Sequence, residues 1–203
     1  MTDATDKDDH EGRDRLIAAF SKVAGEQGYA RLDVETVNRY AGLPPGGFYE
    51  EFESVEQALV AAQEAFLRRL WLEVTTACKG PKEWSLKVRE VVGAVIASLV
   101  EASSLARVFA IEGPGASLAA AERQFAALER LAKLLGEGRR HHSRAADLPA
   151  ITERTLIGGA VSIVSEHLLA EDPRAIPALQ SQLVEVLLTP YLGECEARRV
   201  AVG

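Results

Sequence analysis

The stretch from Asp33 to Leu59, DVETVNRYAGLPPGGFYEEFESVEQAL, constrains the fold more than any other part of the chain. Apolar residues recur at helical spacing in its first part, at Val34, Val37 and Ala41. Asp33 precedes these residues and can cap a helix, because its carboxylate can accept from the free amides of the first turn. Gly42 suits a left-handed exit from that helix. The sequence therefore predicts a short helix that ends in a tight turn.

The second half of the stretch predicts a second short helix and the start of a third. The prolines at 44–45 are expected in the first turn of the second helix, where amide donors have no helical partner. Phe48 and Phe52 are four residues apart and are expected to face the core. Ser54 with Gln57 then forms a capping box for the next helix. Two short helices joined by a glycine-containing turn are the outline of a helix-turn-helix.

This stretch resembles the DNA-binding domain of the TetR family of bacterial transcriptional repressors. Residues 16–30, LIAAFSKVAGEQGYA, are similar to the family's first helix, and residues 34–52, VETVNRYAGLPPGGFYEEF, to its second helix, turn and recognition helix. The positions that match are Ala41, Gly42, Leu43, Gly46, Phe48, Tyr49, Phe52, Ser54 and Glu56. The resemblance implies an all-α fold with an N-terminal helix-turn-helix domain and a C-terminal ligand-binding and dimerisation domain. It also implies a homodimer that binds DNA.

The positions with which the family holds DNA differ in this chain. The family usually has Ser or Thr and then Lys where this chain has Pro44 and Pro45, and it has cationic or aromatic residues where this chain has Glu50 and Glu51. Phosphate affinity comes from cations and from hydroxyl or amide donors, so the surface has lost donors and gained carboxylates. The candidate DNA-binding residues that remain are Arg31, Arg39, Pro45, Gly46, Gly47, Tyr49 and Val55.

The net charge of −7 over 203 residues lies entirely in the N-terminal part. Residues 1–60 hold 13 acidic and 6 basic side chains, whereas residues 61–203 hold 17 of each. A DNA-binding module is expected to be basic, so long-range steering toward DNA would here be repulsive. Part of the excess belongs to residues 1–12, which we expect to form a disordered acidic tail.

We expect nine helices in all, arranged as a tail at 1–12, a helix-turn-helix domain at 13–55 and a ligand-binding and dimerisation domain at 56–203. The first helix is expected to begin near Arg13 and to end at Gly28. Beyond the helix-turn-helix, the predicted helices lie at about 55–78, 82–102, 104–111, 117–136, 148–170 and 174–192. Their expected boundary signals are Lys79-Gly80-Pro81, Gly113-Pro114-Gly115, Asp147 and Asp172-Pro173. The last two helices are the expected dimer interface.

The C-terminal region is expected to hold a small apolar ligand in a chamber bounded by its helices. Pockets of this kind are mostly apolar with a few polar groups. The candidate lining residues are Phe66, Trp71, Trp84, Phe109 and Phe125, with Glu112 and His167 as polar anchors. Ordinary core packing is the competing interpretation of each aromatic residue.

The sequence indicates no catalytic site, cofactor or metal site. Adjacent His141 and His142 point apart on a helix and have no third ligand nearby, so a solvated loop is favoured over a metal site. The acidic N-terminus is unlike a signal peptide, and there is no apolar run long enough to span a membrane. Two distant cysteines, Cys78 and Cys195, fit a reducing cytoplasm.

Two functional classes follow from these observations. The first is a ligand-responsive transcriptional regulator that represses its target genes. The second is a protein of the same fold that has lost ordinary operator binding and serves as a small-molecule or protein-binding module. The family resemblance favours the first class, whereas the charge and the missing phosphate contacts favour the second.

Overall fold

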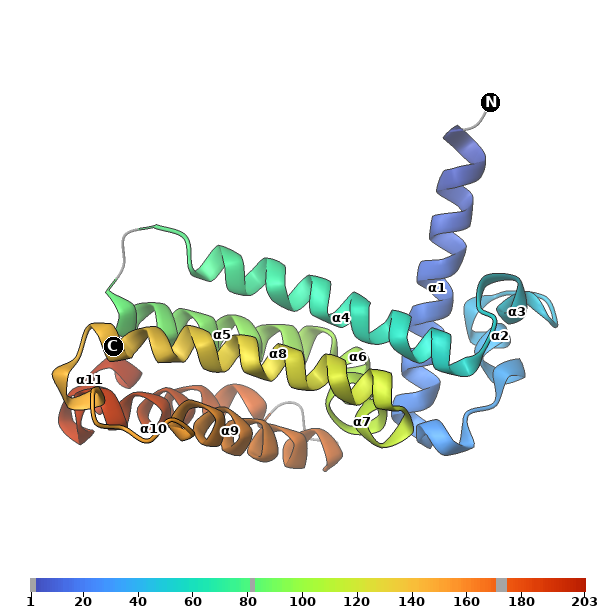
Figure 1. The fold of residues 1–203 in the computed structure, drawn as a ribbon. Coiled ribbons are helices and arrows are strands. Elements are labelled where there is room, and N and C mark those ends of the chain that lie inside the picture. The colour runs from blue at the N-terminus through green and yellow to red at the C-terminus, as the bar shows by residue number, and fades with distance from the viewer. Residues whose placement is uncertain (1–2, 81–82, 171–174) are drawn as a thin grey trace. The chain divides into compact units, whose positions relative to one another are not determined.

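The computed structural model of the chain describes residues 3–80, 83–170 and 175–203. All regular structure in these residues is helical, as predicted, and no strand occurs among them. The fold divides into two compact units, Met1–Phe66 with Ser104–Gln124, and Leu67–Ser103 with Phe125–Gly203 (Figure 1). Segment 104–124 thus belongs to the same unit as the helix-turn-helix, although the two are far apart in the sequence. The functional division expected at residues 13–55 and 56–203 is a different partition and stays a prediction.

The first unit contains the helix-turn-helix and the segment that packs on it. Its elements are α1 (Asp3–Gln27), η1 (Tyr29–Arg31), α2 (Val34–Ala41), α3 (Gly47–Glu51), the first part of α4 (Val55–Ala77), α6 (Ser103–Arg107), the π-helical η2 (Val108–Glu112), α7 (Gly113–Ala116) and the beginning of α8 (Leu118–Gly136). Its core includes Leu16, Phe20, Val23, Val37, Phe48, Phe52, Leu59 and Val108. Because Val108 belongs to this cluster, η2 is part of the core that supports the helix-turn-helix.

The second unit contains the remaining parts of α4 and α8 and the C-terminal helices. Its other elements are α5 (Trp84–Glu101), η3 (Glu137–Arg140), η4 (Ser143–Ala145), α9 (Thr152–Leu169), η5 (Ile176–Leu179), α10 (Gln180–Leu192) and α11 (Glu194–Val202). Helix α10 packs against α5, α9 and α11, so it is the central helix of this unit (Figure 1). Its buried face consists of Leu183, Val184, Leu187, Leu188 and Tyr191.

Local start and stop signals in the helix-turn-helix are confirmed. Asp33 caps α2 with its carboxylate, and Gly42 ends that helix in the left-handed region at φ 71°. The Ser54 hydroxyl accepts from the Gln57 amide at 3.1 Å, as a capping residue should. The reciprocal bond differs from the predicted capping box, since the Gln57 side chain accepts from the amide of Glu53 and not from that of Ser54.

Two helix starts in the first unit differ from the prediction. Helix α1 begins at Asp3 and not near Arg13, so the expected disordered tail at 1–12 is helical where the structure describes it. No proline interrupts this stretch, and the acidic residues near its start suit the positive end of the helix dipole. Helix α3 begins at Gly47, because Gly46 takes a left-handed conformation at φ 90° and places both prolines before the helix.

The predicted break at Gly113-Pro114-Gly115 is also wrong. These residues form α7, which continues directly from η2. Pro114 has no amide to donate to the preceding turn, and the carbonyl of Ala110, four residues earlier, accepts from the side chain of Gln124 instead. The chain therefore stays helical from Ser103 to Ala116.

The C-terminal helices begin later than predicted, and one helix was missed. Helix α9 begins at Thr152, because the residues from 145 to 149, including the predicted cap Asp147, form a loop whose carbonyls bind Arg139. Helix α10 begins at Gln180, and after Gly193 at φ 80° the chain continues into α11. The signals expected at Pro81, Lys82 and Asp172-Pro173 lie outside the described residues.

Candidate functional site

The start of the helix-turn-helix is held by a short polar chain on α2. The Asp33 carboxylate accepts from the amides of Glu35 and Thr36 at 3.3 and 3.1 Å and from the Thr36 hydroxyl at 2.5 Å. Thr36 Oγ1 in turn accepts from the Arg39 guanidinium at 3.1 Å. The hydrogen bond from the Thr36 side chain, followed by the amide bonds, lowers the pKa of Asp33 below its ordinary value. Arg39 is thus exposed, and its guanidinium is oriented by the hydrogen bond to the Thr36 hydroxyl.

A buried asparagine that sequence reasoning missed connects the two helices of the motif. Asn38 is 2% exposed, and its side-chain oxygen accepts from the amide of Phe48 at 2.8 Å. The Asn38 carbonyl also accepts from the amide of Leu43 in the turn at 2.9 Å. Because one residue binds both the turn and the first turn of α3, Asn38 fixes the position of the recognition helix. A buried amide in an apolar stripe was the signal that could have identified it.

The structure separates the candidate DNA-binding residues into exposed and buried ones. Those whose side chains or backbone are exposed are Arg31, Arg39, Pro45, Gly46 and Tyr49. Val55 is half-buried at the start of α4. Gly47 is buried, and its amide donates to the carbonyl of Pro44 at 3.0 Å, so this amide is already engaged. A Cβ at Gly47 would lie 3.1 Å from the Cβ of Leu43, which explains a glycine at that position.

The two acidic residues of the recognition helix have different surroundings. Glu50 is exposed. Glu51 is half-buried beside Arg13, with 3.7 Å between its carboxylate and the guanidinium, and its carbonyl accepts from the same guanidinium at 3.1 Å. Arg13 also lies over the ring of Phe52, 4.5 Å from its centroid. Glu50 therefore contributes the less compensated negative charge.

Only some of the candidate ligand residues come together in one unit. Phe66 and Phe109 are buried in the first unit with their ring centroids 5.1 Å apart. The amide group of Gln124 donates to the carbonyls of Phe109 and Ala110 at 3.4 and 3.1 Å. Glu112, a predicted ligand anchor, accepts from the amide of Tyr29 at 2.8 Å.

The other candidate ligand residues lie in the second unit and have other partners. Trp71 packs under the guanidinium of Arg130, and Trp84 is 6% exposed against the ring of Tyr191. Phe125 is 60% exposed. His167 donates from Nδ1 to the carbonyl of Ile163 on its own helix at 2.9 Å. The predicted common chamber for all seven residues stays a prediction.

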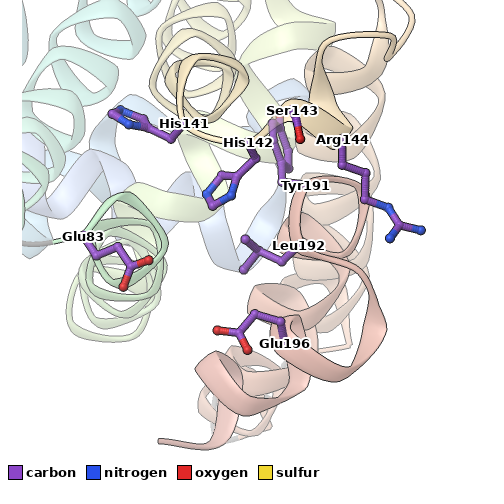
Figure 2. Close-up of a pocket in the computed structure, with 8 residues that line it drawn as sticks. All are labelled: Glu83, His141, His142, Ser143, Arg144, Tyr191, Leu192 and Glu196. Atoms are coloured by element: carbon purple, nitrogen blue, oxygen red, sulfur yellow. The ribbon is translucent and has the colours of Figure 1, made fainter.

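The second unit also contains a pocket that the sequence did not indicate. It has a volume of about 350 Å³ and is lined by Glu83, His141, His142, Ser143, Arg144, Tyr191, Leu192 and Glu196 (Figure 2). Its lining is mostly polar and charged, unlike the predicted apolar chamber. Glu196 is already ion-paired with Arg199 at 2.5 Å, and Arg144 points away from the space that the other side chains line (Figure 2).

An ion pair between half-buried Arg139 and buried Glu153 lies next to this pocket, in contact with the lining residue Tyr191. Glu153 is 7% exposed and accepts from Arg139 at 2.7 and 3.0 Å and from the Tyr191 hydroxyl at 2.6 Å. Burial works to raise the pKa of Glu153, but the hydrogen bonds from Arg139 and Tyr191 outweigh it and lower that pKa. Burial and the bond to Glu153 raise the pKa of Tyr191 well above its ordinary value. This network fixes the loop between α8 and α9, with Arg139 also bound to the carbonyls of Leu148 and Pro149.

In residues 3–80, 83–170 and 175–203, no group of three or more His, Cys, Asp or Glu side chains is placed to hold a metal ion. Within those ranges no single helix has both the length and the apolar content of a membrane span. In the described part of the chain, one bent pair of helices, Trp84–Glu101 with Ser103–Ala116, has that length and apolar content when the two are taken together.

The chain has the fold of TetR-family regulators. No family model and no curated protein matches it. It is similar to the fatty acid degradation regulator FadR from Bacillus halodurans, with TM-score 0.75 and 22% identity over 88% of this chain and 94% of that one. It is also similar to the transcriptional regulator FadR from Bacillus subtilis in complex with stearoyl-CoA (TM-score 0.70, 21% identity, 88% and 97% covered). A tetR-family regulatory protein from Rhodococcus RHA1 gives TM-score 0.69 at 17% identity, with 89% and 96% covered.

Proposed function

We propose that this chain, which has the fold of TetR-family transcriptional regulators, is a ligand-responsive repressor that binds DNA as a homodimer in the cytoplasm. The observation that carries the proposal is the helix-turn-helix frame. Asp33 caps α2, Asn38 bonds to the turn and to α3, and Tyr49 on α3 is 59% exposed. The buried bond between the two helices supports the geometry in which a recognition helix is presented to a groove.

The test is a salt-titrated DNA-binding assay on the full chain. The probe is a fluorescent duplex from the DNA beside its own gene, with a scrambled duplex of equal length as control. The proposal expects preferential binding of the first duplex and a slope of log K against log salt that is shallow, because few cations are exposed on this surface. Equal affinity for both duplexes at every salt concentration would contradict it.

A second candidate function is favoured by the acidic recognition helix. Exposed Glu50 would lie close to phosphate oxygens in any complex with DNA and would repel them. The protein would then be a small-molecule or protein-binding module of the same fold. Undetectable DNA binding even at about 50 mM salt, where phosphate contacts are strongest, together with ligand binding would favour this second function.

The proposed effector is a small apolar molecule that carries a hydrogen-bond donor. The buried Phe66 and Phe109 rings supply an apolar contact surface. Gln63, on the same helix as Phe66, is fully buried, and within the described part of the chain its side-chain oxygen has no hydrogen-bond partner. An apolar surface with one free polar atom is typical of small-molecule sites.

A thermal-shift panel tests this effector class. The panel contains stearoyl-CoA, because the similar FadR of Bacillus subtilis was solved in complex with it, together with free fatty acids and apolar alcohols. A ligand that binds the folded state raises the midpoint of unfolding, and the stabilisation grows with the logarithm of one plus the ratio of its concentration to its Kd. The shift should be lost in Phe109→Ala and kept in Leu72→Ala, whose side chain is 65% exposed. Equal shifts in both variants would contradict the assignment.

The proposed dimer uses α9 and α10. Ile151, directly before α9, is 66% exposed, Ile163 on α9 is 44% exposed, and Val186 on α10 is 56% exposed. Between the two isoleucines lie Gly158 and Gly159, at which a Cβ would meet no atom within 4 Å. Packing inside the chain therefore does not require these glycines, which supports their use in close contact with a second copy. A stable dimer needs an interface of roughly 1,000 Å² or more.

A further inference from the structure

One carboxylate of segment 104–124 contacts the backbone at the start of the helix-turn-helix. Oε2 of Glu112 accepts from the amide of Tyr29 at 2.8 Å, across 83 residues of sequence. Both residues belong to the first compact unit, in which η2 packs against α1 and α7 packs against η1. The bond is partly buried, so water competes for it less than at an open surface.

The amide of Tyr29 needs such a partner because of the way α1 ends. Gly28 terminates α1 with its own amide bound to the carbonyl of Ala24, and it takes a positive φ of 82°. η1 begins directly afterwards, and Gly28 has no side chain that could cap it. The first amides of any helix have no partner within the helix. Glu112 therefore supplies from a distant segment the cap that the local sequence lacks.

The π-helical turn places Glu112 where it can do this. The amide of Gly113 donates to the carbonyl of Val108, five residues earlier, so the turn is one residue wider than in an α-helix. Gly113 is required there, because a Cβ would lie 2.3 Å from the side-chain nitrogen of Gln63 and 2.9 Å from the carbonyl of Val108. The side-chain amide of Gln124 donates to two backbone carbonyls of the same turn. The side chain of Gln124 thus holds the wide turn, and Glu112 is the last residue of that turn.

We propose that Glu112 is a positioning residue for the helix-turn-helix, and not an anchor for the effector. Its carboxylate fixes the amide of Tyr29 and with it η1. The amide of Leu32 binds the carbonyl of Tyr29, and Asp33 then caps α2, so the position of η1 sets where α2 begins. The consequence for DNA rests on the proposed function, whereas the consequence for the amide of Tyr29 does not.

Amide hydrogen exchange on the full-length protein, followed by NMR, tests the first consequence. Glu112→Ala should raise the exchange rate of the Tyr29 amide at least tenfold, because a charge-assisted bond is lost. Glu112→Gln keeps an acceptor oxygen and should raise it less. Glu122→Ala, which removes an exposed carboxylate from the same segment, should leave it unchanged.

An unchanged Tyr29 rate in folded Glu112→Ala would overturn the proposal, and so would an equal rise in all amides of α1 to α3. If Glu112→Ala does not fold, the same comparison between Glu112→Gln and Glu122→Ala decides.

DNA binding by the same variants tests the second consequence. With the duplex from beside the gene, Glu112→Ala should bind at least fivefold more weakly than Glu122→Ala, while both bind a scrambled duplex equally. Equal affinities in the presence of a faster Tyr29 amide would overturn the positioning role. Absence of DNA binding by the wild type would instead refute the proposed function and leave the exchange result to decide the contact itself.

Discussion

The side-chain oxygen of Asn38 accepts a hydrogen bond from the backbone amide of Phe48 at 2.8 Å, and this bond connects α2 to α3. Phe48 is fully buried, so its amide has no access to water if the bond is lost. A buried donor without a partner costs about 1–3 kcal/mol. The orientation of the recognition helix therefore depends on one amide side chain.

Asn38→Ala should lower the free energy of unfolding by about 1–3 kcal/mol, because the Phe48 amide is left unpaired. Urea denaturation followed by circular dichroism measures the change. Glu35→Ala, on the exposed side of the same helix, is the matched control and should stay within about 0.5 kcal/mol of the wild type. Similar stabilities of the two variants would show that the bond has no net effect.

Reversing the charge of Glu50 should strengthen DNA binding. Glu50→Arg replaces an exposed carboxylate by a cation, so non-specific affinity should rise and the salt slope should steepen by about 0.9 for one added phosphate contact. Fluorescence anisotropy with a scrambled duplex across a salt series measures both quantities. Glu194→Arg, an equal charge change at an exposed position of the second unit, is the control. If both variants behave alike, net charge rather than the recognition surface is responsible.

Glu51 should respond differently from Glu50. Its carboxylate lies 3.7 Å from Arg13, so its removal leaves the charge of that guanidinium uncompensated, while the bond to the Glu51 carbonyl and the contact with the Phe52 ring remain. We expect Glu51→Gln to strengthen non-specific DNA binding, because the uncompensated charge of Arg13 then attracts phosphate. The double variant Arg13→Gln/Glu51→Gln should lose that gain in the same anisotropy assay. A gain that persists in the double variant would exclude Arg13 as its source.

The parts of the fold that could be predicted are those determined by neighbouring residues. The carboxylate of Asp33 binds amides two and three residues ahead, and the hydroxyl of Ser54 binds an amide three residues ahead. Gly42 adopts its conformation through its own lack of a Cβ. Spacing in the sequence contains all the information needed for these features.

Contacts between distant segments could not be predicted in the same way. Asp147 is a good local capping residue, yet α9 begins at Thr152 because Arg139 binds the intervening carbonyls. The sequence alone favours Glu112 as a ligand anchor, because no local pattern shows that the amide of Tyr29, 83 residues away, faces it. In the candidate DNA interface, the family resemblance indicates Arg39 and Tyr49, which are exposed, whereas it does not indicate the pairing of Arg13 with Glu51.

Bulk at Gly159 should weaken the proposed dimer. Ile151, directly before α9, and Thr155, Gly159 and Ile163 on α9 follow one another at intervals of four and are all exposed. A Cβ at position 159 meets no atom within 4 Å and the position is exposed, so Gly159→Leu should fold normally but prevent close approach of a partner helix. Sedimentation velocity at micromolar concentration should show the wild type at twice 21.9 kDa and the variant shifted toward one chain.

Gly115→Leu controls for the substitution itself, since a Cβ at exposed Gly115 likewise meets nothing within 4 Å. It should sediment like the wild type. A dimer of unchanged stability in Gly159→Leu would place the interface elsewhere, and a monomeric wild type would refute the dimer altogether.

The Glu153 network should make stability depend on acid in a defined direction. Hydrogen bonds from Arg139 and Tyr191 hold the pKa of Glu153 below its ordinary value of 4.5 despite its burial. A carboxyl with a lower pKa in the folded state binds fewer protons there than in the unfolded state. Its stabilising contribution is therefore fully present above about pH 4.5 and is lost as the pH falls through the folded pKa.

Glu153→Gln should consequently differ most from the wild type near pH 7, and the two free energies of unfolding should converge as the pH falls below about 4.5. Arg139→Met leaves the carboxylate of Glu153 without its cation and should cost about 1–3 kcal/mol at pH 7, because the half-buried Arg139 is itself partly screened by water. In Arg139→Met/Glu153→Gln that uncompensated charge is absent, so the double variant should be more stable than Arg139→Met alone. Urea denaturation at a series of pH values measures all four proteins. Parallel pH profiles for the wild type and Glu153→Gln would mean that Glu153 titrates alike in the folded and unfolded chain, and the proposed charge-assisted network would then be wrong.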